Sequence, residues 1–292
     1  MHIAVYGRKL KPNATEHVAH FFKLLKAKGI SYTVYSPFQR HLINDHQLQI
    51  DDDVFTKKKE ITKSIDFVFS LGGDGTILDI VSWIGKKEIP VVGINFGRLG
   101  FLASSSIADI EESLNAIIEG KHVIDSRSLI QLETNKKLFG NSSFALNEFT
   151  VQRVETSSMI TVHAFLNGQH LNSYWADGLI IATATGSTGY SLSCGGPVIY
   201  PNSKNFVITP VAPHNLNVRP MVVPDDVELK LKIEGRSKRF LTTLDSRNKT
   251  IDASFELTLR KAPFQAQLVR LSSSSFVNAI REKLLWGEDL RN

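Results

Sequence analysis

A glycine-rich loop separates a strand-like segment from a helix-like one. Residues Leu71–Thr76 read Leu-Gly-Gly-Asp-Gly-Thr, directly after the apolar run Ile65–Ser70 and directly before the helix-like run Ile77–Val81. Glycine adopts positive φ and has no Cβ, so the backbone N–H groups of such a loop can close on anionic oxygens at the start of a helix. The sequence therefore predicts a strand, loop and helix that handle phosphate.

The carboxylate inside this loop needs its own explanation. Asp74 would repel a phosphate group if it had no other task. It is explained if it takes a proton from an attacking hydroxyl, or if it holds a metal ion that cancels the charge. Asp74 is therefore the candidate catalytic residue.

Strand-like and helix-like segments alternate over the first 120 residues. Strands are expected at Ile3–Tyr6, Ser31–Tyr35, Phe67–Leu71 and Ile89–Ile94, and helices at Glu16–Lys28, Ile77–Ile84 and Ala108–Glu119. This alternation is typical of an α/β domain. We expect residues 1–120 to form a Rossmann-like domain with a mostly parallel sheet.

The pattern changes to successive β-rich runs from about Lys121 onward. These runs are Leu129–Thr134, Ser143–Val154, Ser158–Asn167, Leu179–Thr183, Glu228–Ile233, Phe240–Leu244 and Phe255–Arg260. Residues 121–272 should therefore form a predominantly β domain. Helical spacing returns over Ser275–Trp286, and its apolar stripe predicts that the segment 273–292 packs back on the first domain.

Composition excludes several classes of partner. Among the 292 residues the formal net charge is +5, and the tight basic run is Lys57–Lys59, without interleaved aromatic residues, so we expect no nucleic-acid binding. No apolar stretch approaches the ~20 residues that cross a bilayer, so we expect no membrane span. The single cysteine, Cys194, fits a reducing, cytoplasmic setting. His17 and His20 lack a third ligand, and no metal site made by the protein alone is expected.

A second glycine-rich segment covers Asp177–Pro197. It contains an apolar strand, a hydroxyl-rich and glycine-rich turn, and a short stretch that presents Tyr190 and Ser193. Hydroxyls and free N–H groups suit a nucleobase edge and a ribose, and a tyrosine ring offers a stacking face. A solvent-exposed β-turn is the alternative, but such turns need only about two to five residues. The segment favours a nucleotide site.

A polar pair, Asn147 and Glu148, lies within the strand-like run Ala145–Thr150. Adjacent strand residues point to opposite faces, so one of the two should face a cleft unless the strand bulges there. Taken alone, the pair also fits an edge or bulge feature.

Together these three elements resemble the NAD kinase family. That family carries a Gly-Gly-Asp-Gly-Thr loop, an Asn-Glu pair in its β domain and an Asp-Gly-x-Ile…Thr-x-Thr-Gly-Ser-Thr-x-Tyr-Ser segment, and all three occur here in that order. Two further segments are similar to family motifs. They are Asn95–Leu102, similar to Asn-x-Gly-x-Leu-Gly-Phe-Leu, and Pro213–Pro220, similar to Pro-His-x-Leu-x-x-Arg-Pro.

The resemblance implies an ATP-dependent NAD kinase that makes NADP. Asp74 would be the general base that activates the 2′-hydroxyl of the adenosine ribose of NAD, and Mg²⁺ would assist while bound mainly through ATP. The implied binding residues are Gly72, Gly73 and Gly75 at the phosphates, Asn147 and Glu148 at the ribose and adenine, Thr188, Gly189, Tyr190, Ser191, Leu192 and Ser193 around the adenine, and Asp177 and Ala212 toward the nicotinamide. The resemblance also implies a homodimer or homotetramer.

The chain departs from the family pattern at outer positions. Trp175 stands where an arginine is frequent, Asp79 where a basic or polar residue is usual, and Asp245-Ser246-Arg247 where Asp-Gly-Gln is common. Asp245 and Arg247 are therefore kept as candidate outer contacts of the nucleotide site.

Three other functions fit parts of the pattern. A lipid kinase shares the glycine loop but does not need the adenine-facing segment Thr188–Ser193. A regulator that binds NAD or NADP without turnover fits the altered outer positions, although a pure binder does not require Asp74. A Rossmann dehydrogenase needs a Gly-x-Gly-x-x-Gly spacing, which is absent at Gly72–Thr76.

Overall fold

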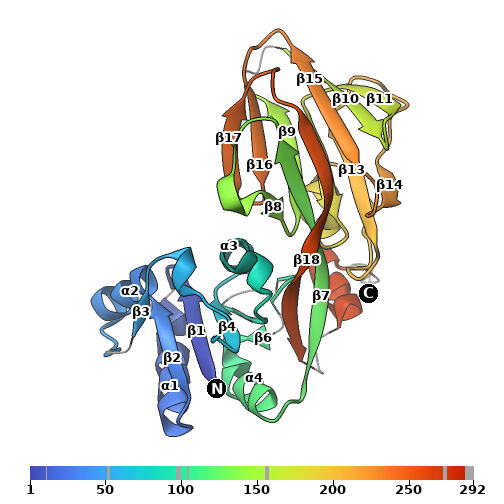
Figure 1. Cartoon of the computed structure of the whole chain (residues 1–292). Coiled ribbons are helices and arrows are strands. Elements are labelled where there is room, and N and C mark those ends of the chain that lie inside the picture. The colour runs from blue at the N-terminus through green and yellow to red at the C-terminus, as the bar shows by residue number, and fades with distance from the viewer. Residues whose placement is uncertain are drawn as a thin grey trace. The chain divides into compact units, whose positions relative to one another are not determined.

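The chain divides into two compact units. The computed structural model describes residues 1–10, 12–50, 53–96, 100–103, 105–154, 158–271 and 275–286 (Figure 1). Unit 1 comprises residues 1–126 and 267–292, and unit 2 comprises residues 127–266. Residues 97–99 of the predicted Asn95–Leu102 motif, and residues 273–274 and 287–292 of the predicted C-terminal segment, lie outside the described residues.

Unit 1 is built on a parallel sheet. Its strand order is β3 (Val54–Phe55), β2 (Ser31–Tyr35), β1 (His2–Gly7), β4 (Phe67–Leu71) and β5 (Val91–Asn95). The short β6 (Ser105–Ser106) and the last part of β18 (Leu257–Leu271) also pair in parallel with β5. The central strands β4 and β5 are mostly apolar and almost wholly buried, as expected of a parallel sheet whose faces are covered by helices.

The described residues of unit 1 form five α-helices. They are α1 (Thr15–Ala27), α2 (Ser36–His46), α3 (Asp74–Ile84), α4 (Ile110–Ile118) and α6 (Phe276–Leu284), with 3₁₀ turns at Pro12–Ala14, Lys58–Glu60, Gly85–Lys87 and Ile107–Asp109. Helix α1 buries Val18, Phe21, Phe22 and Leu25, the i, i+3, i+4, i+7 stripe that a helix presents to a core. The ring of Phe21 lies 5.3 Å from that of Phe69 on β4, centroid to centroid. Burial of this stripe fixes α1 on the sheet.

The strand order places a ligand site at one edge of this sheet. In a 3-2-1-4-5 parallel sheet the connections reverse direction between β1 and β4, and ligands bind outside the carboxyl ends of the strands at such a point. The glycine loop follows the carboxyl end of β4, and Arg8 follows that of β1. The topology alone therefore directs attention to Gly72–Gly75.

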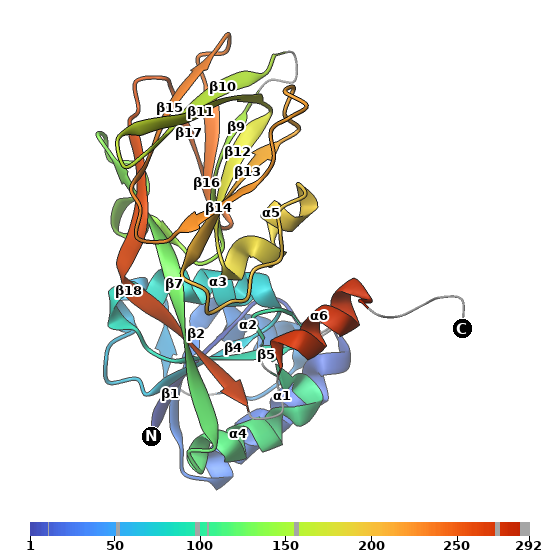
Figure 2. The same ribbon diagram turned by 90° about the vertical axis from the view of Figure 1, so that its right-hand side faces the viewer.

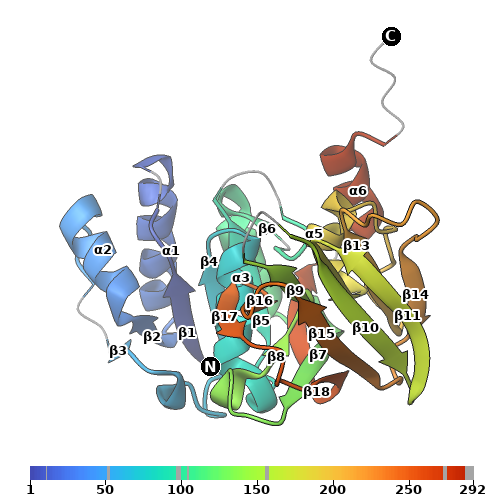
Figure 3. The same ribbon diagram turned by 90° about the horizontal axis from the view of Figure 1, so that it is seen from above.

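Unit 2 is antiparallel throughout its two sheets. One has the order β14 (Met221–Pro224), β13 (Asn205–Val211), β12 (Gly178–Thr183), β9 (Glu148–Arg153), β16 (Phe240–Leu244) and β17 (Arg247–Ile251). The other contains β11 (Gln169–Ala176), β10 (Ile160–Leu166), β15 (Leu229–Gly235) and β18, and β7 (His122–Thr134) pairs with β8 (Phe144–Ala145) (Figure 3). Alternate residues of these strands, such as Phe149 and Val151 or Val162 and Ala164, form one apolar core.

Helix α6 returns to unit 1, as the sequence predicts (Figure 2). The ring of Phe276 lies 6.3 Å from the ring of Phe101, and the Lys283 ammonium lies over the Phe101 ring at 4.6 Å. Ile280 is buried. The predicted fold class, a mostly parallel α/β region followed by a β region and a C-terminal helix, is confirmed.

The sequence-based expectation lacks helix α2 and strands β3, β6, β11, β13, β14 and β17, and it merges β8 with β9. Helix α2 has only Phe38 and Leu42 buried, too few apolar residues for a visible stripe, and β11 is largely polar. The expected single run Ser143–Val154 is divided into β8 and β9, with Leu146 and Asn147 between them. This interruption shapes the candidate site.

Among the residues that the structure describes, no helix is both long enough and apolar enough to cross a bilayer.

Candidate active site

The glycine loop forms a tight entry into α3. Gly72 has a φ of 154°, and a Cβ at this position would lie 2.4 Å from the hydroxyl oxygen of Thr76. Gly73 precedes the first residue of the helix, Asp74, and Gly73 and Gly75 are exposed. The first N–H groups of a helix have no acceptor within it and carry partial positive charge. The exposed start of the helix at Gly73 and Gly75 is therefore of the kind that can donate to an anion, and the predicted role of these glycines at phosphates stays a prediction.

Backbone N–H groups hold the Asp74 carboxylate from a distant segment. Phe101 donates to Oδ2 at 2.8 Å, and Leu102 and Ala103 donate to Oδ1 at 3.3 and 3.4 Å. A Cβ on Gly100 would lie only 1.5 Å from Asp74 Oδ1, so only glycine lets the chain approach this closely. The orientation of the carboxylate is thus set by the segment that follows β5.

Arg8 supplies the positive charge beside this loop. Its guanidinium pairs with Asp79 on α3 and is 55% exposed, and its Nη1 lies 3.8 Å from where a Cβ on Gly75 would be. Burial and the nearby Asp79 charge raise the pKa of Tyr6 above its ordinary value. Asp79, one of the departures from the family pattern, thus fixes an arginine from the end of β1 near the glycine loop.

In unit 2, the side chains of Asn147 and Glu148 point to the same side. A Cβ on Gly189 would lie 3.0 Å from Glu148 Oε2 and 3.5 Å from Asn147 Nδ2. Two neighbours share a side because the strand is interrupted between Ala145 and Glu148. The structure therefore brings together three of the residues that the sequence assigns to the nucleotide.

The Glu148 carboxyl is buried and incompletely partnered. The residue is 9% exposed, and within the described part of the chain Glu148 Oε2 and Asn147 Oδ1 are buried without a hydrogen-bond partner. Burial, and then the negative charge of Asp245, raise the pKa of Glu148 to about 8, against a hydrogen bond from the Tyr190 backbone. At neutral pH this carboxyl is mostly protonated in the free protein.

The Asp177–Pro197 segment places its predicted residues in different surroundings. Tyr190 begins α5 (Tyr190–Ser193), is exposed, and accepts a hydrogen bond from Gln152 at 3.1 Å. Thr188 ends the 3₁₀ turn Thr185–Thr188 and is half-buried, whereas Ser193 is exposed. Asp177 pairs with Arg153 at 2.8 Å.

Ser191, Leu192 and Ala212 differ from this group. The Ser191 hydroxyl is fully buried and bonded to that of Thr209 at 2.8 Å, so it holds α5 to β13. Leu192 is half-buried, and Ala212 is exposed with a φ of 44°.

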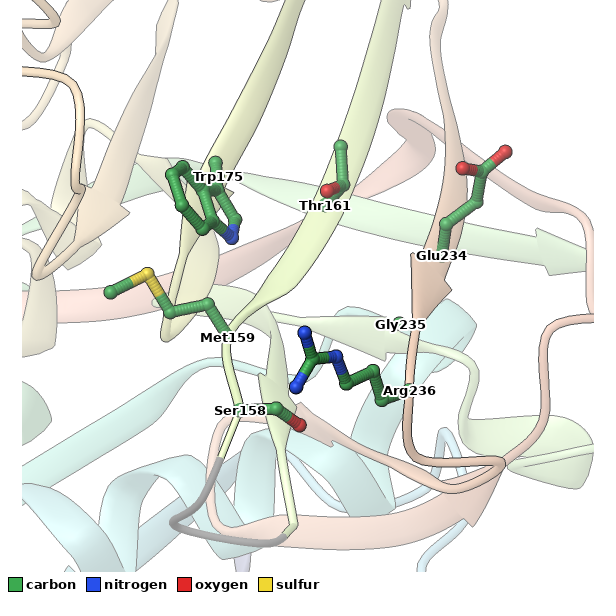
Figure 4. A pocket seen from close by; sticks show the side chains of 7 residues that line it. All are labelled: Ser158, Met159, Thr161, Trp175, Glu234, Gly235 and Arg236. Carbon is green, nitrogen blue, oxygen red and sulfur yellow. The ribbon is translucent and has the colours of Figure 1, made fainter.

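Trp175 lines a separate hollow on unit 2. The indole is 45% exposed and its centroid lies 4.2 Å from that of His214. The open hollow, of about 610 Å³, is shown in Figure 4, with the Arg236 guanidinium extending from beyond the end of β15 toward the β10 side. Its lining residues are Ser158, Met159, Thr161, Trp175, Glu234, Gly235 and Arg236. None of the predicted nucleotide residues lines it.

Comparison with known proteins identifies the family. The model of the ATP-NAD kinase N-terminal domain matches residues 3–122, and that of the ATP-NAD kinase C-terminal domain matches residues 146–271. The NAD kinases of Cytophaga hutchinsonii and Bacteroides fragilis are 45% and 43% identical to the chain, each covering 100% of both sequences. The chain belongs to the ATP-NAD kinase family.

Solved structures of the family share the fold. An NAD kinase from Archaeoglobus fulgidus in complex with ATP is 26% identical, with a TM-score of 0.74 over 98% of this chain and 99% of that one. Yeast NADH kinase complexed with NADH has a TM-score of 0.88 at 22% identity, covering 100% of this chain and 89% of that one. The predicted recognition of the NAD kinase family, and of an enzyme, is confirmed.

Sequence reasoning missed the groups that hold the site residues in place. Gly100 to Ala103, which fix Asp74, were seen only as part of a family-like motif, and Thr183, which bonds the Leu146–Asn147 backbone, was not singled out. The signal for the first was present, because a Leu-Gly-Phe-Leu stretch after a strand has no obvious role of its own. In this member of the ATP-NAD kinase family, that role is to orient a carboxylate.

Replacing Gly100 with alanine should disable the enzyme. The new Cβ would displace the Asp74 carboxylate, and a misplacement of about 1 Å at a reacting group costs ~10²-fold in rate. We expect Gly100→Ala to lower kcat for NADP formation by ~10²-fold or more, while thermal melting still reports a folded protein. A variant with unchanged kcat would contradict the steric argument.

Replacing Glu148 with glutamine should stabilise the free protein in a pH-dependent way. The pKa of this carboxyl rises from 4.5 to about 8 on folding. As pH rises between these values the unfolded chain loses the proton that the folded one keeps, so the free energy of unfolding falls, by up to roughly 4–5 kcal/mol. Glutamine carries no such penalty.

The measurement is the melting temperature without nucleotide at about pH 5 and about pH 8.5. The advantage of Glu148→Gln over the unchanged protein should be clearly larger at the higher pH, whereas the exposed Glu256→Gln should show no such trend. An advantage independent of pH would rule out the raised pKa as its source.

Proposed function

We propose that Asp74 is the general base of this ATP-dependent NAD kinase. The supporting observation is the capture of its carboxylate by the N–H groups of Phe101, Leu102 and Ala103 at the start of α3. These donors bond to both carboxylate oxygens and restrict the rotation of the carboxylate. A general base must present an oxygen within hydrogen-bond reach of the proton it accepts.

The reaction class follows from the family. The enzyme is a phosphotransferase that phosphorylates NAD with ATP and so makes NADP. A lipid kinase, a regulator without turnover and a Rossmann dehydrogenase, the alternatives that the sequence alone left open, are therefore not the function of this chain.

The chemical step that we assign to Asp74 is a proton transfer. As the 2′-hydroxyl oxygen of the adenosine ribose forms a bond to the γ-phosphorus of ATP, its proton passes to the Asp74 carboxylate. The bond between the γ-phosphorus and the β,γ-bridging oxygen breaks, and ADP leaves with that oxygen. The backbone N–H groups of Gly73 and Gly75 would stabilise charge on the phosphate oxygens, as donors at a helix start do. Gly72 would line the phosphates without donating to them, because its N–H donates to the Ile94 carbonyl at 2.9 Å.

Asn147 and Glu148 are proposed to hold the ribose and adenine of NAD. Their unpartnered oxygens, Asn147 Oδ1 and Glu148 Oε2, suit the hydroxyl and amine donors of an adenosine. Thr188, Gly189, Tyr190 and Ser193 would surround the adenine. We keep Asp177 and Ala212 toward the nicotinamide, and give Ser191 and Leu192 a supporting place in the adenine site because Ser191 is buried against Thr209.

Magnesium would be bound mainly through ATP. Among the residues that the structure describes, no group of three or more His, Cys, Asp or Glu side chains is arranged to hold a metal ion. Mg²⁺ needs no such cluster, because it is usually bound by one or two carboxylates together with substrate phosphates. In the glycine loop, Asp74 would be the carboxylate available to the ion. When bound, the ion supplies neutralisation of charge on the β- and γ-phosphate oxygens.

We further propose that the enzyme works in the cytoplasm as a homodimer or homotetramer. The single cysteine fits a reducing compartment. Exposed strand edges such as β14 and β17 offer a route by which subunits of a β-rich region can pair.

Asp74→Asn tests the assignment of the base. The amide keeps the shape of the side chain but cannot accept the proton, so kcat should fall by ~10²-fold or more while the dissociation constant for NAD changes little. NADP formation from NAD, ATP and Mg²⁺ is the measurement. Asp66→Asn is the matched control, because Asp66 precedes β4, is exposed, and accepts an N–H from His2 away from the loop. Full activity in Asp74→Asn would remove the residue from the mechanism.

A further inference from the structure

The turn between β16 and β17 contains a buried, strained aspartate. Asp245 and Ser246 join the two strands, and Asp245 has a φ of 52°, in the left-handed region that most residues avoid. Aspartate tolerates this conformation better than most residues because its short polar side chain can bond locally. Its side chain is nevertheless only 3% exposed. A carboxylate placed so deeply in a two-residue turn needs partners.

These partners are the backbone N–H groups of the interrupted strand. Leu146 donates to Asp245 Oδ2 at 3.0 Å, and Asn147 and Glu148 donate to Oδ1 at 2.8 and 3.2 Å. In return, the N–H of Asp245 donates to the Glu148 carbonyl at 3.0 Å. The carboxylate thus accepts the N–H groups of the segment where the chain leaves β8 and enters β9.

Arg247 secures the chain just before this interruption. Its guanidinium donates to the carbonyls of Ser142 and Phe144, lies over the Phe144 ring at 5.8 Å, and reaches to 3.9 Å from Asp245 Oδ2. Arg247 therefore ties β8 to the same turn that carries Asp245. Burial is the main effect on the Asp245 carboxyl and raises its pKa. The positive charge of Arg247 acts in the opposite direction and lowers the pKa of Asp245.

The opposite side of the interrupted strand is equally fixed. Thr183 donates its N–H to the Asn147 carbonyl at 2.8 Å and its hydroxyl to the Leu146 carbonyl at 2.6 Å. A Cβ on Gly186 would lie 2.1 Å from the Asn147 carbonyl oxygen, so this backbone also lies tightly against the 3₁₀ turn. The N–H groups of residues 146–148 thus donate to Asp245, and the carbonyls of Leu146 and Asn147 accept from Thr183. The backbone of this segment is held from both sides.

Two side-chain oxygens of this segment have no hydrogen-bond partner among the described residues. Asn147 Oδ1 and Glu148 Oε2 are buried without a partner in the described part of the chain, although the backbone of both residues is fully bonded. A buried polar atom without a partner is unfavourable, and its presence in a folded protein needs an explanation. A bound ligand that supplies the missing hydrogen bond is one such explanation. The backbone hydrogen bonds of Asn147 and Glu148 therefore fix the positions of these two side-chain oxygens.

We propose that Asp245 and Arg247 are a positioning pair for NAD binding: they hold the Leu146–Glu148 backbone so that Asn147 Oδ1 and Glu148 Oε2 meet the nucleotide, and do not contact it themselves. The inference rests on the proposed role of Asn147 and Glu148 in binding NAD. It gives the Asp245-Ser246-Arg247 departure from the family's Asp-Gly-Gln a function, because an arginine at the third position reaches carbonyls that a shorter side chain would not.

The main test is Asp245→Asn in the full-length protein. The amide keeps one acceptor oxygen but turns an NH₂ group toward one of the N–H donors, which loses a charge-assisted hydrogen bond. We expect the dissociation constant for NAD, measured by calorimetry without ATP, to rise about tenfold, and KM for ATP to change less than about twofold. Asp225→Asn is the matched control, since Asp225 is a buried unit 2 aspartate paired with Lys261 at 2.9 Å and bonded to Ser128. It should lower the melting temperature but leave NAD affinity unchanged.

Arg247→Gln provides a second route if Asp245→Asn does not fold. It removes the bonds to the Ser142 and Phe144 carbonyls from a side chain that is 25% exposed, and should weaken NAD binding about three- to tenfold, with Arg247→Lys regaining part of the loss. Unchanged NAD affinity in the folded variants, or equal weakening toward NAD and ATP, would overturn the inference.

Asn147→Ala separates this inference from the proposed function. If Asn147→Ala weakens NAD binding and the Asp245 and Arg247 variants do not, the positioning pair is wrong and the role of Asn147 stands. If Asn147→Ala leaves NAD affinity unchanged, the proposed role of Asn147 fails and the positioning inference fails with it.

Discussion

In each unit the candidate residues depend on the same kind of interaction, bonds between a carboxylate and the backbone N–H groups of a distant segment. In unit 1, Phe101, Leu102 and Ala103 hold Asp74. In unit 2, a single aspartate, Asp245, holds the backbone of residues 146–148. Such bonds are directional and gain strength from the ionised acceptor, so they fix orientation more firmly than apolar packing does. Main-chain bonds thus position the Asp74 carboxylate and the backbone of residues 146–148.

Close approach of the backbone to another segment explains which glycines this arrangement requires. A Cβ on Gly100 would overlap the Asp74 carboxylate, and one on Gly186 would overlap the Asn147 carbonyl. Gly186 lacks the positive φ that usually accounts for the residue. Each is needed for space, whereas Gly72, with a φ of 154°, is needed for both space and conformation. The glycine-rich motifs are therefore sites of contact between segments as much as flexible loops.

The sequence predicted what periodicity and local composition determine. The strands of unit 1, the stripe of α1 and the loop before α3 follow from nearby residues, and so does the β character of unit 2. The interruption at Leu146–Asn147 could not be predicted, because it depends on Asp245, nearly a hundred positions away. The sequence left open whether one of Asn147 and Glu148 faces a cleft or the strand bulges. The interruption between β8 and β9 lets the side chains of both residues approach Gly189. Likewise, nothing local to Asp74 indicates that Gly100 to Ala103 orient it.

In unit 2, Asn147 and Glu148 are held in place at a cost in stability. Glu148 is buried beside another carboxylate, which together with burial raises its pKa to about 8, and its Oε2 has no partner in the described residues. A hydrophobic residue of similar size would be more stable there, since a buried polar atom without a partner costs about 1–3 kcal/mol. The strained φ at Asp245 adds about 1–3 kcal/mol more. These costs persist only where the surrounding bonds over-determine the geometry, as the contacts of Thr183 and Arg247 do here. A ligand that bonds to Glu148 Oε2 and Asn147 Oδ1 then recovers in binding what the free protein gives up in folding.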